Sequence, residues 1–140
     1  MNEIADEDVP ALLLRTVPES APFIADKYGL PAERAVLTQD AVLDLYEVLT
    51  ECFTTPVLMP QLQSSVPDAG LLQRCWDFVE PIVDHSSNHV RGAVYFEVLE
   101  PLLNAHGLIE RSWPYMKERT RQRTLLMLHS YGTSVPGVTS

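Results

Sequence analysis

The densest group of residues that could do chemistry lies between positions 80 and 106. It consists of carboxylates and imidazoles: Glu80, Asp84, His85, His89, Glu97, Glu100 and His106. Metal sites in helical bundles use such side chains on facing helices, usually as Glu-x-x-His pairs. No Glu-x-x-His occurs in this chain. We therefore favour solvated residues at a turn between helices. The alternative is a metalloenzyme whose ligands are Glu80, Asp84, His85, Glu97 and Glu100.

Other kinds of catalytic chemistry have little support in the sequence. There is no G-x-S-x-G motif, and the six scattered glycines form no phosphate-binding loop. Cys52 and Cys75 have no C-x-x-C spacing, and each stands beside an aromatic residue in an apolar helical pattern. This placement predicts two buried thiols in a reducing compartment. We expect no catalytic residue and no cofactor.

The chain has no lysine, arginine or histidine between Arg34 and Arg74. Inside this stretch, residues 38–54 have helical periodicity, with apolar residues on one face. Four acids follow one stripe of the opposite face at the spacing i, i+4, i+7 and i+11: Asp40, Asp44, Glu47 and Glu51. Like charges so placed repel one another, and no intervening lysine offsets them. We predict that this stripe contacts a partner.

The net charge of −9 is unevenly distributed. Residues 1–70 hold 12 acidic and 3 basic residues, whereas residues 71–140 hold 7 of each, so the first half carries the whole excess. This asymmetry suits a basic protein partner and disfavours nucleic acid and anionic membranes. No apolar run approaches the roughly 20 residues that span a bilayer, and the N-terminus is acidic. We expect a cytoplasmic protein.

One basic stretch, residues 111–123, interleaves arginines with aromatic residues, as some nucleic-acid-binding proteins do. The overall negative charge instead favours pairing with the acidic half of the same chain or of a second copy. A secondary contact surface would comprise Trp113, Tyr115, Arg119, Arg121 and Arg123.

The elements that must position these residues read as helices throughout, because no alternating strand and no N-G or D-G turn occurs. We predict an all-α bundle of about six helices in a single domain, residues 9–131, between disordered tails at residues 1–8 and 132–140. Thr38 or Asp40 would cap the acidic helix, and Pro56 would break the chain after it. Further helices are predicted at about residues 10–16, 18–28, 69–84 (capped by Asp68), 88–104 (capped by Ser86 or Ser87) and within 114–130.

Two of these helices share a nine-residue pattern at an offset of 20 positions. Residues 76–84 and 96–104 both read aromatic, acid, apolar, apolar, Glu, Pro, apolar, apolar, Asx. The repeat predicts a HEAT-like helical hairpin over residues 69–105, with a kink or a lost hydrogen bond at Pro81 and at Pro101.

The segment C-W-D-F-V-E … V-R-G-A-V-Y-F-E-V-L-E-P-L-L, with the continuation W-P-Y-M-K-E-R-T-R, resembles small bacterial helical domains. Such domains include presumed immunity proteins of polymorphic toxin systems. The resemblance covers a third to two fifths of the chain and transfers no catalytic residue. It implies a compact α-helical binding protein without enzymatic activity.

The leading hypothesis is therefore an immunity-type protein that neutralises a basic toxin or effector by stoichiometric binding through the acidic stripe. The metalloenzyme is the second hypothesis. The third is a homo-oligomeric adaptor, in which the acidic half of one subunit meets residues 119–123 of another.

Overall fold

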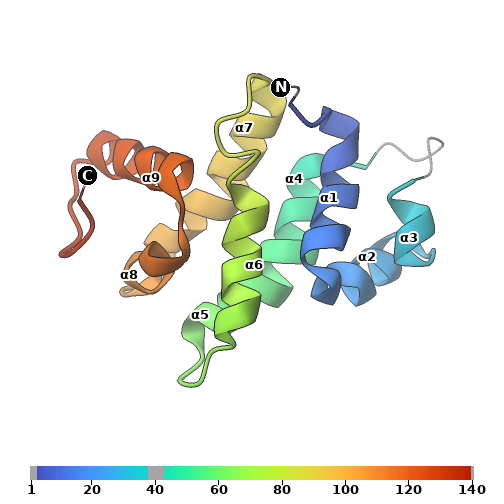
Figure 1. The fold of residues 1–140 in the computed structure, drawn as a ribbon, viewed down its shortest axis with the longest axis horizontal. Coiled ribbons are helices and arrows are strands. Elements are labelled where there is room, and N and C mark those ends of the chain that lie inside the picture. Colours follow the sequence, from blue (N-terminus) through green and yellow to red (C-terminus); the bar gives the residue numbers. More distant parts are fainter. Residues whose placement is uncertain (1–2, 38–42, 140) are drawn as a thin grey trace.

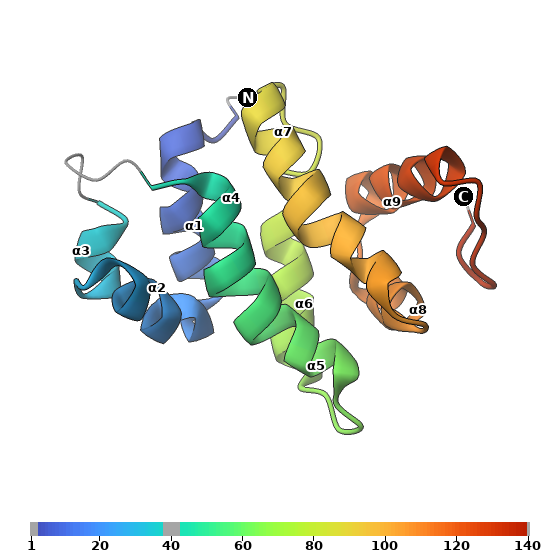
Figure 2. The same ribbon diagram turned by 180° about the vertical axis from the view of Figure 1, so that it is seen from behind.

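The computed structural model describes residues 3–37 and 43–139, and this part of the chain is all-α with no strand. The predicted all-α class is confirmed. Figures 1 and 2 show α1, α2 and α3 at one end of the molecule and α8 and α9 at the other, with the remaining helices between them.

The N-terminal part consists of short helices. A 3₁₀ turn at Asp6–Asp8 leads into α1 (Val9–Thr16), and a second turn at Pro18–Ser20 leads into α2 (Ala21–Tyr28). Gly29 ends α2 in the left-handed region (φ +68°), a conformation that glycine adopts without strain. A single turn, α3 (Ala32–Ala35), follows.

The acidic segment belongs to one long helix made of α4 (Leu45–Val48), a π-helical segment Leu49–Leu58 and α5 (Met59–Gln63). The predicted break at Pro56 is wrong, because the helix continues through it without interruption (Figure 2). Proline has no N–H to donate and crowds the carbonyl one turn before it; the wider π turn accommodates both effects.

The predicted caps of this helix also need correction. Asp44 is the N-cap, and its carboxylate accepts hydrogen bonds from the backbone N–H groups of Tyr46 (2.9 Å) and Glu47 (3.3 Å). Thr38 and Asp40 lie outside the described residues.

The next two helices begin where the sequence predicted. Asp68 caps α6 (Ala69–Val79) by accepting from Leu71 N–H (3.0 Å), and Ser87 caps α7 (Asn88–Val94). The first of them ends at Val79, five residues earlier than predicted, and residues 80–84 form a turn around Pro81. A π-helical segment Tyr95–Leu99 and a 3₁₀ helix Glu100–Asn104 continue α7.

Pro101 explains this change of helix type. It cannot donate to the carbonyl of Glu97, four residues earlier. The buried hydroxyl of Thr54 donates to that carbonyl instead (2.7 Å), and Thr50 donates to the Glu97 carboxylate. The two π-helical segments are thus joined by polar contacts between them.

The C-terminal part comprises α8 (Leu108–Ser112), a 3₁₀ turn Trp113–Tyr115 and α9 (Glu118–Ser130). α1 packs against α6, and α7 packs against α4. The core between them is apolar and includes the fully buried Trp76, Phe53 and Phe78, the last two in edge-to-face contact with ring centroids 5.1 Å apart. A Cβ atom at Gly92 would lie 2.7 Å from the Tyr46 hydroxyl, so glycine permits this approach of α4 to α7.

Both described ends of the chain contact the helical part of the molecule. Residues 3–8 have a defined conformation and contact the turn between α6 and α7. Beyond α9, Thr133 N–H donates to Leu128 O (3.0 Å), and Val138 is buried. Within the described residues no helix has the length and apolar character needed to cross a membrane.

Candidate functional site

Asp44, Glu47 and Glu51 form what we call the acidic face, at the start of the long helix. The Glu47 and Glu51 side chains are 55% and 53% exposed, and Asp44 is exposed as well. Asp44 is held by its capping bonds, so its carboxylate has a fixed position. The structure therefore brings three of the four predicted partner-binding residues to one surface; the fourth, Asp40, lies outside the described residues.

Lys27 on α2 modifies this surface. Its Nζ atom lies 2.8 Å from Glu51 Oε2 and 3.6 Å from Glu47 Oε2, and the lysine side chain is only 19% exposed. The hydrogen bond to Glu51 raises the pKa of Lys27, so the ammonium group stays charged. No lysine lies within the stripe itself, but Lys27 from another helix offsets part of its charge. Glu47 and Glu51 share one ammonium group, and Asp44 adds a third carboxylate, so the face retains negative charge.

The predicted secondary contact surface is engaged mainly within the chain. The Arg121 guanidinium stacks 4.8 Å from the Trp113 ring centroid, and its N–H groups donate to Trp113 O (2.8 and 3.2 Å). Tyr115 is half-buried, and its carbonyl accepts from the Gln73 side chain (3.1 Å). Arg123 pairs with Asp84, whereas the Arg119 side chain is exposed.

α9 is attached to α6 and the turn after it by carboxylates. Glu80 accepts from the N–H groups of Arg119 (3.1 Å) and Thr120 (3.0 Å) and from the Thr120 hydroxyl (2.9 Å). It therefore caps α9, which has no capping side chain of its own. Asp77 pairs with Lys117 (3.1 Å), and Asp84 pairs with Arg123.

The repeated Glu-Pro pairs explain part of this arrangement. Glu80 holds the first turn of α9, and Glu100, its counterpart 20 positions later, accepts a hydrogen bond from Tyr131 just after the last turn (2.5 Å). This bond raises the pKa of Tyr131 to about 12. The two equivalent glutamates therefore fasten opposite ends of one helix.

The metal-binding cluster of the alternative hypothesis is not assembled. Its five side chains have five different partners. Glu80 contacts the start of α9, Asp84 pairs with Arg123, and His85 contacts Ile4. Glu97 contacts Thr50, and Glu100 contacts Tyr131. Among the described residues no three histidine, cysteine, aspartate or glutamate side chains gather closely enough to hold a metal ion.

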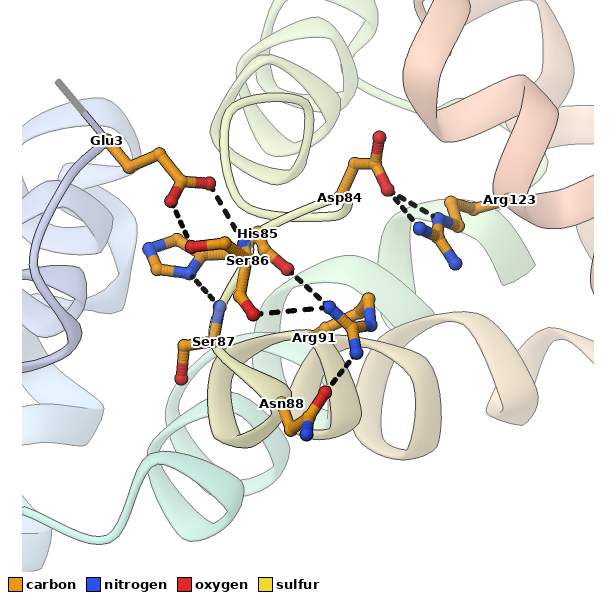
Figure 3. A network of polar contacts seen from close by, with 8 residues as sticks. All are labelled: Glu3, Asp84, His85, Ser86, Ser87, Asn88, Arg91 and Arg123. Atoms are coloured by element: carbon orange, nitrogen blue, oxygen red, sulfur yellow. Dashed lines mark hydrogen bonds and ion pairs between the residues drawn. The ribbon is translucent and has the colours of Figure 1, made fainter.

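The turn between α6 and α7 is a network of polar contacts (Figure 3). Buried His85 accepts from Ser87 N–H at Nδ1 (2.9 Å), so its Nε2 carries the proton and donates to Ile4 O (2.7 Å). Glu3 accepts from Ser86, and this contact lowers the pKa of Glu3. Both ring nitrogens of His85 are therefore engaged, one by Ser87 and the other by the N-terminal segment.

The two cysteines are free and buried, as predicted. Burial raises the pKa of Cys52 to about 11 and that of Cys75 to about 12, so neither thiol ionises near neutral pH. Neither resembles an activated nucleophile, whose pKa is normally lowered.

Two residues that shape these surfaces escaped the sequence analysis. Lys27 is 20 or more positions before the carboxylates that it binds, and only the packing of α2 against the long helix brings it there. Arg91 contacts the carbonyl groups of the α6–α7 turn (Figure 3), which no spacing rule indicates.

Comparison with known proteins adds no assignment to this geometry. A scan against protein-family models, a search of curated proteins and a search of solved structures each returned no match.

Proposed function

We propose that this chain is a non-enzymatic binding protein that captures a basic protein through the acidic face. The observation that carries the proposal is the half-exposure of Glu47 and Glu51 beside Asp44, with Lys27 as the one cation bound to them among the described residues. Fixed carboxylates on a helix attract a basic partner at long range and speed its capture.

The rest of the molecule supports this proposal over the metalloenzyme. The ligands required for the metal site are engaged in separate contacts that hold α9 and the α6–α7 turn in place. Both cysteines are buried with raised pKa values. The carboxylates of the acidic face, by contrast, remain exposed.

The homo-oligomeric adaptor is also less favoured, because most of the side chains that it requires are already engaged within the chain. Its basic surface would comprise residues 119–123. Arg119 is exposed, but Arg121 stacks on Trp113 and Arg123 pairs with Asp84. A second copy would have to displace these contacts before it could use either guanidinium.

Within the class of binding proteins, we propose the immunity type, in the cytoplasm, with a toxin or effector domain as the basic partner. The HEAT-like hairpin proposed for residues 69–105 would serve as the scaffold that supports the long acidic helix. This part of the proposal rests on the sequence resemblance together with the charge of the acidic face.

Co-expression with the products of the adjacent genes tests this function. One product should be basic, form an equimolar complex with this chain in size-exclusion chromatography with light scattering, and lose its toxicity to the host cell. Failure of both neighbours to bind would contradict the immunity assignment. A covalent change in the partner, detected by mass spectrometry, would contradict the non-enzymatic one.

A further inference from the structure

A cavity of about 250 Å³ lies between α7 with its π-helical continuation and α9. It is separate from the acidic face and has a different character. Buried Val83 and Leu99 line it with aliphatic surface, and Tyr95 and Phe96 contribute aromatic surface. Phe96 is 49% exposed and packs edge-to-face on Tyr95, with ring centroids 5.0 Å apart.

Two guanidinium groups, from different elements, also line this cavity: Arg91 from α7 and Arg123 from α9 (Figure 3). Asp84 neutralises Arg123 by accepting from its Nε (2.8 Å) and from a second nitrogen. Arg91 instead donates to neutral acceptors, namely the carbonyls of His85 (2.8 Å) and Ser86 (3.4 Å) and the Asn88 amide oxygen. These contacts fix the Arg91 guanidinium without compensating its charge.

The cavity therefore combines an apolar lining with one positioned cation, Arg91, that pairs with no carboxylate among residues 3–37 and 43–139. A guanidinium recognises a carboxylate through paired N–H donors, and a few polar groups in an apolar cavity usually set the orientation of a small ligand. We propose that this cavity binds a small monocarboxylate with an aromatic or aliphatic body. The carboxylate would face Arg91, and the body would lie against Phe96 and Leu99. One negative charge on the ligand is enough, because Asp84 already neutralises Arg123 and only the charge of Arg91 remains to be paired.

The proposal does not depend on the proposed function, because it concerns another surface and a ligand of opposite charge. Amide chemical-shift titration of the full chain tests it, with 3-phenylpropanoate as the probe and 3-phenylpropanamide as its neutral counterpart. The acid should give saturable shifts at residues 83, 91–92, 95–96 and 99, and the amide should bind about tenfold more weakly or not at all. Equal binding of acid and amide, or the absence of saturable shifts, would overturn the proposal.

Arg91→Gln should weaken binding of the acid by about tenfold and leave binding of the amide unchanged. Arg111→Gln is a matched control, because Arg111 also donates to a backbone carbonyl (Leu62 O, 2.6 Å) but does not line the cavity. The control should bind the acid like the parent chain. If Arg91→Gln fails to fold, Phe96→Ala takes its place and should weaken both ligands. Parent-like affinity in either cavity variant would contradict the proposed site.

Discussion

Carboxylates serve different ends in the two halves of this molecule. On α6 and the turn after it, Asp77, Glu80 and Asp84 each bind a group of α9. On the long helix, Glu47 and Glu51 share a single lysine and remain half-exposed. The comparison teaches that charge balance within the chain separates acids that build the fold from acids that remain for a partner.

The largest effect is expected at Glu80, where the comparison can be tested from its structural side. Glu80→Ala removes the acceptor of two backbone N–H groups and one hydroxyl at the start of α9, and should cost about 2 kcal/mol of unfolding free energy. Urea denaturation measures the loss, and hydrogen exchange should show weaker protection in α9. Glu100→Ala, which removes one contact with exposed Tyr131, should cost clearly less. An equal or larger loss for Glu100→Ala would refute the capping role assigned to Glu80.

Glu19 provides an intermediate case, since it joins the two halves through Arg74 (2.6 Å). The hydrogen bond from Arg74 lowers the pKa of Glu19 below its usual value of 4.5. The stabilisation is therefore complete above that value and is lost as the pH falls through the lower, folded-state pKa. Glu19→Gln should destabilise the protein at neutral pH by up to about 1 kcal/mol, because the pair is partly exposed.

Thermal or urea unfolding of Glu19→Gln and the parent chain across the acidic pH range checks this sign. The two proteins should converge in stability as the pH falls. A difference that persists or grows toward low pH would show that the ion pair with Arg74 is not its source.

The smallest effect on stability is expected at the acidic face. Glu47→Gln or Glu51→Gln removes part of the contact with Lys27 but also relieves repulsion between neighbouring acids. Each substitution should change the unfolding free energy by no more than about 0.5 kcal/mol. Urea denaturation measures this change. A loss of more than about 1 kcal/mol of unfolding free energy in either variant would contradict the comparison, because these acids would then stabilise the fold.

The sequence predicted where α6 and α7 begin, with Asp68 and Ser87 as caps, because these starts depend on local periodicity and on side chains within one turn. It failed at Pro56, where a π-helical segment absorbs the proline. The hydroxyl of Thr54 in that segment donates to the carbonyl of Glu97 in the segment Tyr95–Leu99, 43 positions further along the chain. Local rules carry no information about such a contact.

The sequence predicted the carboxylates of the acidic face but not the lysine that binds them. Helical spacing placed Glu47 and Glu51 on one surface, but the lysine that shares their charge comes from α2. The role of Glu80 as a cap for α9 depends equally on packing. The repeated Glu-Pro pattern marks Glu80 and Glu100 as equivalent, but it does not show that they contact opposite ends of α9. Pairing between distant segments is decided by tertiary structure, and neither composition nor spacing specifies it.

The most direct test of the acidic face is the rate at which it captures its partner. Stopped-flow association with the basic product of the adjacent gene should be measured at low and high salt for Glu47→Lys/Glu51→Lys. A matched control, Glu110→Lys/Glu118→Lys, changes the net charge equally at exposed positions on α8 and α9. The account predicts an association rate about tenfold slower and less dependent on salt for the first variant, with a small change for the control. Equal slowing in both variants, or none in the first, would contradict it.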